Sequence, residues 1–384
     1  MTKNWEIKTL GEVCEVLDSK RKPITKRNRI AGDYPYYGAT GILDYVHEYI
    51  FDEKLILIGE DGAKWDAGEN TAFIAEGKYW VNNHAHVIRP NRSAVLDNWL
   101  IYFLNFTDLK EYVTGLTVPK LNQEKMRGIT FPLPPLSEQK RILKILDKAF
   151  VAISTAKANA EKNLQNAREL FESYLQSVFA NPGDGWEEKK LGEVLEKTET
   201  TDPTKNPDKE FIYIEVSSVN KENLSIESTT LMKGKDAPSR ARKLIKINDV
   251  IFATVRPTLR RIAIIPKEYD GQVCSTGYFV LRAKKHLNNI LVFYFLLTNN
   301  FNKRMEKLQK GASYPAVTDK DVREQIITYP ISPKEQRAIV SKLDTLSAET
   351  KKLEAIYQQK LADLDELKKS ILQKAFTGQL TIEN

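Results

Sequence analysis

Two clusters of basic side chains in this sequence could bind the phosphates and base edges of a nucleic acid. The first crowds a proline-containing loop near the N-terminus and comprises Lys20, Arg21, Lys22, Lys26, Arg27 and Arg29. The second is interleaved with strand-like residues and comprises Arg240, Arg242, Lys243, Arg256, Arg260 and Arg261. Lys and Arg neutralise phosphates, and the fork of an Arg side chain can pair with O6 and N7 of guanine. We predict nucleic-acid contacts in both clusters; a solvated basic loop and structural Arg residues are the alternative interpretations.

Two short glycine-containing segments, residues 114–120 and 310–315, are similar to each other and could also reach a nucleic acid. Glycine lets a backbone approach closely, a hydroxyl can bond a base or a phosphate, and Lys or Tyr adds charge or stacking. The candidate side chains are Thr117, Lys120, Lys310, Ser313 and Tyr314. Ordinary tight turns are the alternative interpretation of both segments.

Other chemistry finds little support in the sequence. His84 and His86 would share one face of a strand, which could begin a metal site, but no third ligand has a helpful spacing, so we expect a structural role and no metal. Cys14 and Cys274 are far apart and are expected to be buried apolar residues. We find no Asn/Asp-Pro-Pro-Tyr/Phe string, no phosphate-binding GxxxxGK[ST] loop and no evident nuclease carboxylate cluster, so we assign no catalytic residue.

The chain repeats itself. The segment Trp5–Glu15 returns as Trp186–Glu196, an offset of 181 residues, and Ile101–Leu104 returns as Phe293–Leu296. Near the end of each copy the offset becomes constant at 197, as for the Glu-Gln pairs, the Leu-Asp pairs and the Leu-Gln-x-x-Phe strings. An offset that grows and then stays constant indicates duplicated domains with variable loops, each followed by a continuous helix.

Apolar residues at alternating spacings of four and three, without Pro or Gly, predict one long helix over residues 137–180 and another from residue 333. Proline-rich strings precede both helices. The first helix is rich in Ala and the second in Leu and Tyr, so we expect them to pair antiparallel, small residues against large. Two independent helices, each on its own domain, are the alternative.

The expected order is a globular domain (1–136), a helix (137–180), a second globular domain (181–332), and a second helix with a C-terminal tail (333–384). We expect an α+β fold in which two similar domains are joined by two long antiparallel coiled-coil helices with approximate twofold symmetry. Strands are predicted at residues 54–58, 86–89, 250–253 and 278–282, and helices at residues 97–109 and 288–310. A capping box at Thr318–Asp321 predicts a shorter helix.

Length, composition and charge are those of a globular protein that could bind a polyanion, although many basic proteins bind no nucleic acid. The 384 residues suffice for two domains, and 41% hydrophobic with 28% charged residues is typical of globular proteins. A net charge of +7 favours a polyanionic partner. The N-terminus has no signal-peptide core and no apolar run is long enough to span a bilayer, so we expect a cytoplasmic protein.

Four strings in the first domain and at its boundary resemble motifs of the specificity subunits of type I restriction-modification enzymes: Tyr34–Ile42, Leu57–Ala63, Val81–Val87 and Pro134–Gln139. Together with the repeat and the two helices, the resemblance covers nearly the whole chain. The second domain has Asp249–Pro257 where the first has its Gly-Glu-Asp-Gly string. Two unlike domains of this family imply two unlike DNA half-sites.

The resemblance implies that each target-recognition domain reads half of a bipartite target in double-stranded DNA, while the helices set the spacer and dock methyltransferase subunits. It implies two modification subunits that methylate adenine with S-adenosylmethionine, and restriction subunits that use ATP and Mg and cut DNA. This chain would be non-catalytic and carry no cofactor. The recognition subunit of a related type II restriction system, a stand-alone enzyme and a protein-binding coiled-coil scaffold are the rival interpretations.

Overall fold

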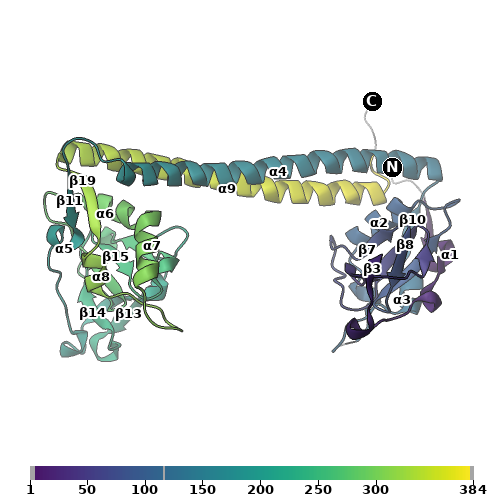
Figure 1. Cartoon of the computed structure of the whole chain (residues 1–384), viewed down its shortest axis with the longest axis horizontal. Coiled ribbons are helices and arrows are strands. Elements are labelled where there is room, and N and C mark those ends of the chain that lie inside the picture. The colour runs from purple at the N-terminus through teal and green to yellow at the C-terminus, as the bar shows by residue number, and fades with distance from the viewer. Residues whose placement is uncertain (1–4, 116, 381–384) are drawn as a thin grey trace. The chain divides into compact units, whose positions relative to one another are not determined.

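The computed structural model describes residues 5–115 and 117–380. The chain divides into two compact units, Met1–Glu161 with Gln358–Asn384 (unit 1) and Lys162–Tyr357 (unit 2). Each unit therefore consists of one globular domain together with a part of each of two long helices, α4 (Leu136–Ala180) and α9 (Pro333–Phe376) (Figure 1). Among the described residues, no helix has both the length and the apolar character that crossing a membrane requires.

Domain 1, the globular part of unit 1, contains two four-stranded sheets and a two-stranded ribbon. One sheet has the order β2 (Cys14–Val16), β9 (Ala85–Pro90), β6 (Leu55–Gly59), β7 (Ala72–Ala75). The other has the order β4 (Gly41–Val46), β3 (Ala31–Gly38), β8 (Lys78–Val81), β5 (Phe51–Asp52). The ribbon pairs β1 (Glu6–Thr9) with β10 (Thr130–Leu133). The helices are α1 (Leu10–Val13), α2 (Asp97–Phe106) and α3 (Gln123–Arg127).

Domain 2, the globular part of unit 2, repeats this plan with a smaller first sheet. That sheet has the order β16 (Ile262–Ile264), β15 (Val250–Ala253), β18 (Tyr278–Leu281), and the ribbon pairs β11 (Trp186–Lys190) with β19 (Ile326–Pro330). The second sheet has the order β13 (Thr230–Lys233), β12 (Glu210–Ile214), β17 (Val273–Ser275), β14 (Ala241–Leu244). The helices are α5 (Leu191–Val194), α6 (Asn289–Leu296), α7 (Asn299–Leu308) and α8 (Asp319–Arg323).

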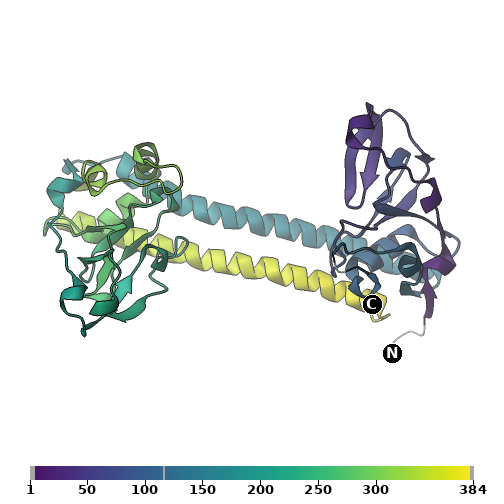
Figure 2. The same ribbon diagram turned by 90° about the horizontal axis from the view of Figure 1, so that it is seen from below.

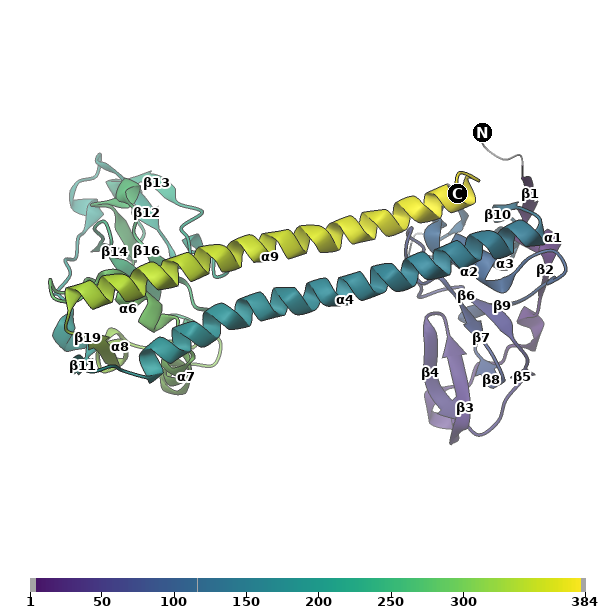
Figure 3. The ribbon, with the colours of Figure 1, turned by 90° about the horizontal axis from the view of Figure 1, so that it is seen from above.

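The two long helices run antiparallel within each unit (Figures 2 and 3). In unit 1, Lys368 of α9 lies over the ring of Phe150 of α4, and Lys157 pairs with Asp365. In unit 2 the same order appears in the pair Arg168–Glu354, with 2.9 Å between Nε and Oε1, and in Lys342, which lies over the ring of Tyr174. In both units, rising residue numbers on α4 meet falling numbers on α9, so the predicted antiparallel pairing is confirmed.

A buried glutamine fastens each globular domain to the start of the helix that follows it. Gln139, fully buried, accepts a hydrogen bond from the backbone N–H of Leu96 (2.9 Å) and donates to the carbonyls of Ala94 (2.9 Å) and Pro134 (2.8 Å). The second copy repeats all three bonds: Gln336 is bonded to the backbone of Asn288, His286 and Pro330. The repeated Glu-Gln pair in the sequence therefore has a structural cause.

A tyrosine–aspartate bond repeats in the same way. Tyr102 of α2 donates its hydroxyl to Asp147 of α4 at 2.6 Å, and Tyr294 of α6 donates to Asp344 of α9 at 2.5 Å. Both residues of each pair belong to strings that the sequence repeats. The repeat thus preserves contacts between domain and helix as well as apolar positions.

The repeated Leu-Gln-x-x-Phe strings complete the cores of the two units. In unit 1, Phe376 near the end of α9 packs edge-on against Trp99, with 4.9 Å between ring centroids, and against Phe103 at 5.4 Å. In unit 2, Phe179 near the end of α4 packs edge-on against Phe295 at 5.7 Å. The C-terminal end of each long helix is therefore part of a domain core rather than a free end.

Local structure follows the sequence predictions with one clear exception. The predicted helix over residues 288–310 is wrong as a single element, because α6 ends at Leu296 and α7 begins at Asn299. The break has a cause in Thr298, whose buried hydroxyl accepts from the backbone N–H of Phe301 and caps α7. The predicted capping box at Thr318 is confirmed at the start of α8. Both cysteines are buried thiols, as predicted.

Candidate nucleic-acid interface

The two glycine-containing segments form the same tight loop in both domains. Loop A (residues 114–120) is closed by two backbone hydrogen bonds between Thr114 and Lys120, and loop B (residues 310–316) by two between Lys310 and Ala316. Leu116 of loop A lies outside the described residues. Gly115 and Gly311 have φ values of +92° and +106°. A Cβ on Gly115 would lie 2.5 Å from the carbonyl oxygen of Val118, so loop A requires glycine there.

The tips of these loops expose unlike side chains at equivalent positions. Val118 in loop A is 66% exposed and Tyr314 in loop B is 70% exposed. The preceding hydroxyl residues, Thr117 and Ser313, are exposed as well. Single exposed apolar residues are common on proteins. Here the exposed apolar or aromatic side chain recurs at the same position of a repeated loop, and its identity differs between the two domains.

Each loop is held against the end of the central strand of its domain. The backbone N–H of Leu121 donates to the carbonyl of Glu60 (2.8 Å), directly after β6. Equivalently, the N–H of Val317 donates to the carbonyl of Thr254 (2.9 Å), directly after β15. The position of each tip is therefore fixed by a buried strand, which is how a rigid scaffold presents a binding loop.

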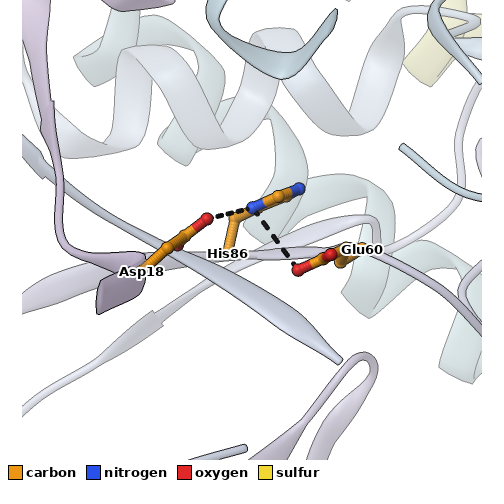
Figure 4. A group of neighbouring side chains, drawn as sticks. All are labelled: Asp18, Glu60 and His86. Atoms are coloured by element: carbon orange, nitrogen blue, oxygen red, sulfur yellow. Dashed lines mark hydrogen bonds and ion pairs between the residues drawn. The ribbon is translucent and has the colours of Figure 1, made fainter. Parts of the chain in front are cut away.

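In domain 1, a network of charged side chains joins loop A to the basic N-terminal loop, and Figure 4 shows three of its members, Asp18, Glu60 and His86. The ring Nδ1 of His86 lies 2.6 Å from Oδ2 of Asp18 and 3.6 Å from Oε2 of Glu60. Arg21 pairs with both carboxylates, and Nζ of Lys120 lies 2.7 Å from Oε1 of Glu60. Strand β9, the end of β6 and both loops are thereby tied together.

The carboxylates of this network are ionised because their neighbours outweigh the effect of burial. Burial alone would raise the pKa of Asp18, but the hydrogen bond and charge of His86, the backbone N–H of Val87 and the charge of Arg21 hold that pKa below its ordinary value. Burial also acts to raise the pKa of Glu60, and hydrogen bonds from Lys120 and Arg21 lower it overall. Both carboxylates therefore face the positively charged side chains around them as anions.

The same group contains three potential metal ligands that the sequence did not bring together. Ligand atoms of Asp18, Glu60 and His86 all lie within 4.8 Å of one another. His84, which was considered with His86, points to a different partner and pairs with Asp61. Nε2 of His86 faces the carbonyl oxygen of Leu121 at 2.7 Å, so both of its ring nitrogens already face protein oxygens. These contacts support the hydrogen-bonded structural role.

The basic residues predicted in domain 1 fall into two groups. Arg21 and Lys120 belong to the buried network, and Arg29 pairs with Asp44 (3.2 Å) while lying 4.3 Å from the ring centroid of Tyr36. These side chains position loops rather than point freely outward. The exposed ones, without an ion-pair partner among the described residues, are Lys20, Lys22, Lys26 and Arg27.

In domain 2 most of the predicted basic residues are also bound to the protein itself. Lys243 pairs with Asp319 at 2.8 Å and Arg242 with Asp202 at 3.1 Å. Arg260 donates to the side chain of Asn299, and Arg261 donates to the backbone carbonyls of residues 217 and 219. The cluster members that are exposed and have no carboxylate at ion-pair distance, within residues 5–115 and 117–380, are Arg240 and Arg256. Lys310, in loop B, is likewise exposed.

Two similar α+β domains, each with an exposed loop fixed to its central strand, define a duplicated recognition protein. Comparison with known families specifies it further. Two copies of the family model described as the type I restriction modification DNA specificity domain match residues 2–163 and 183–362. The chain therefore belongs to this family. The family is that of type I systems, so the type II alternative is not supported.

Individual relatives agree with the family match. The type I restriction enzyme MjaVIII specificity subunit of Methanocaldococcus jannaschii is 24% identical over 99% of this chain and 94% of its own length. S.HindORF215P of Haemophilus influenzae, named as a type I restriction enzyme specificity subunit, is 38% identical, and the match spans 37% of this chain and 36% of that protein. A chain from a solved structure concerning complex assembly and conformational transition of the type I R-M system shares the fold, with a TM-score of 0.73 at 19% identity, over 99% of this chain and 100% of that one.

Proposed function

We propose that this chain is the DNA specificity subunit of a type I restriction-modification complex, in which each domain reads one half of a bipartite target in double-stranded DNA. The observation that carries the proposal is the repeated loop, which exposes Thr117 and Val118 in one domain and Ser313 and Tyr314 in the other. A hydroxyl can bond a base edge or a phosphate, and an apolar side chain can contact the methyl group of thymine. The two domains are similar but their loop tips differ, which fits two half-sites of different sequence.

Affinity would come from the exposed cations. The side chains that would neutralise phosphates are exposed ones: Lys20, Lys22, Lys26 and Arg27 in domain 1, and Arg240 and Lys310 in domain 2. Because each phosphate contact releases counterions, binding of the assembled complex to DNA should weaken steeply as salt rises. Loss of one of these charges should lower affinity for all sequences alike and reduce the salt dependence.

The chain itself would be non-catalytic and would direct partner subunits. Its expected partners are two modification subunits that methylate adenine, and restriction subunits that cut DNA. S-adenosylmethionine, ATP and Mg would be bound by those partners, with no cofactor in this chain. The exposed faces of α4 and α9 would dock the modification subunits, leaving the loops to the DNA. Such a complex works where the chromosome lies, so we place this chain in the cytoplasm.

Mapping methylated adenines in host DNA, with and without this gene, tests the proposal. We expect one bipartite sequence, two short blocks separated by a fixed number of unread base pairs, to be methylated only when the gene is intact. A methylation pattern that does not change when the gene is removed, or one with a single uninterrupted block, would contradict the proposed function. Purified chain that methylated or cut DNA alone would instead establish a catalytic role.

A further inference from the structure

At one equivalent position the two domains both have a positive φ but carry very different residues. After the bridges that fix loops A and B, Asp61 to Lys120 and Val255 to Ala316, the next residue is Gly62 in domain 1 and Arg256 in domain 2. Both have left-handed backbones, with φ of +71° and +49°. The fold therefore requires a left-handed backbone conformation at this position, and domain 1 has glycine there whereas domain 2 has arginine.

Arginine is conformationally unfavourable at such a position. A residue with a Cβ is disfavoured in the left-handed region, whereas glycine is not. Arg260, at the other end of the short turn 257–259, is also left-handed, with φ of +51°. Residues held in unfavourable backbone conformations cluster at active and ligand-binding sites, where the surrounding structure holds them in place.

The side chain of Arg256 lies on the tip of loop B. Its guanidinium carbon is 4.9 Å from the ring centroid of Tyr314, and Nη2 donates to the carbonyl oxygen of Ser313 at 3.2 Å. No carboxylate of the described residues is at ion-pair distance from it. In contrast, Arg242 pairs with Asp202, and Arg261 is bound to two backbone carbonyls. Arg256 is therefore oriented by an aromatic ring while most of its N–H groups stay available.

We propose that Arg256, stacked on Tyr314, is a specificity-determining residue that reads a guanine in the half-site of domain 2. This rests on the proposed function and assigns one base reader within it. A guanidinium fork matches the O6 and N7 acceptors of guanine in the major groove, and stacking on an aromatic ring limits the freedom that is lost on binding. Gly62 leaves domain 1 without an equivalent reader.

Replacing Arg256 by glycine, the residue at the equivalent position of domain 1, provides the test. Arg256→Gly removes the side chain and relieves the left-handed strain, so the melting temperature should stay within about 3 °C of wild type. We would assemble the full chain with its modification subunits and select bound duplexes from a random pool. The wild type should select two sequence blocks. In the variant, the ratio of affinities for a G·C pair over other base pairs at one position of one block should fall about 5- to 150-fold, and the other block should be unchanged.

Two further variants distinguish base recognition by Arg256 from the effect of its positive charge and from the general effect of a surface substitution. Arg256→Lys keeps the positive charge but not the fork, so it should lose the same preference while keeping the salt dependence of the wild type. Lys285→Ala is the control: Lys285 is exposed and follows the end of β18, whose Leu281 pairs with Val250 at the start of β15, opposite the end that leads to Arg256. This control should leave both blocks unchanged.

The outcomes distinguish the inference from the function on which it rests. If the wild type selects no sequence at all, the proposed function fails and the inference fails with it. If the wild type selects two blocks and both Arg256 variants retain the same preferences, only the inference is overturned. If Arg256→Gly does not fold, Arg256→Lys decides: loss of one G·C preference supports the inference, and full retention overturns it.

Discussion

Single buried side chains decide how the loops of domain 1 are held, and Asp18 is the clearest case. It is bonded to Arg21, three residues further along the chain, and to the side chain of His86 and the backbone N–H of Val87, both on β9. Sequence alone predicted the basic loop but not this network, because the partners are far apart in sequence and no periodicity links them. The predicted loops with Gly115 and Gly311 could be found, because their spacing is local and repeated.

Replacement of Asp18 by Asn should destabilise unit 1. Asn keeps the size of the side chain but removes the charge that Arg21 and His86 face in a buried site, which should lower the free energy of unfolding by about 3 kcal/mol. Thermal or urea unfolding at neutral pH measures this. The matched control is Asp33→Asn, an exposed strand residue, which should change stability by about 0.5 kcal/mol or less. Equal effects of the two substitutions would remove the structural role given to the network.

The same network predicts how stability responds to acid. The pKa values of Asp18 and Glu60 are lower in the folded protein than the ordinary values of 3.8 and 4.5, so the unfolded chain takes up protons first as pH falls. Their contribution should be complete above about pH 5 and be lost as pH falls below about 4. Urea unfolding between pH 7 and pH 3 should show a steeper loss for wild type than for Asp18→Asn. Parallel curves would contradict the assignment.

At the scale of elements, the junction between domain and helix is set by a repeated glutamine. Gln139→Ala should leave the N–H of Leu96 without a partner in a buried site and remove two further bonds, lowering the stability of unit 1 by about 3 kcal/mol. Hydrogen exchange at the Leu96 amide should accelerate. Lys140→Ala, an exposed neighbour on the same helix, is the control and should have little effect. Slow exchange retained at Leu96 in the glutamine variant would refute this role of Gln139.

Packing between the two long helices depends on small residues on one side of α4. In unit 2, the hydroxyl oxygen of Thr350 lies 3.5 Å from the carbonyl oxygen of Ala167, which a larger residue at 167 would hinder. In unit 1, Ala160 is 1% exposed while Ala158 is exposed. Ala160→Leu should therefore lower stability by about 1–3 kcal/mol through overpacking, and Ala158→Leu should be near neutral, as measured by thermal unfolding. Similar melting temperatures for both would mean that the helices do not pack closely there.

The elements also show what the sequence could and could not predict. The long helices, the strands β6, β9, β15 and β18 and the cap of α8 follow from periodicity and turn chemistry. The break between α6 and α7 was missed because apolar residues continue through Leu297, although Thr298 is a capping residue that could have marked it. The repeated Glu-Gln, Tyr and Asp residues were visible as a pattern, but only the structure shows that they bond domain to helix.

At the scale of the whole molecule, each long helix begins in one repeat and ends in the core of the unit that contains the other repeat. Gln139 near the start of α4 is bonded to domain 1, and α4 ends in the core of unit 2; Gln336 near the start of α9 is bonded to domain 2, and α9 ends in the core of unit 1. Both helices therefore connect the two recognition domains. We propose that this double connection fixes the number of unread base pairs between the two half-sites.

Lengthening both helices together tests this account most directly. A heptad inserted after Glu161 in α4 and after Tyr357 in α9, at the boundary of the two units, keeps the apolar faces in phase and adds about 10 Å to each helix. At 3.4 Å per base pair, the gap in the methylated sequence should widen by roughly 3 bp. A heptad in one helix alone should disrupt the pairing and lower stability. Mapped methylation with both blocks unchanged and a wider gap is the predicted result; an unchanged gap in the doubly lengthened protein would contradict the account.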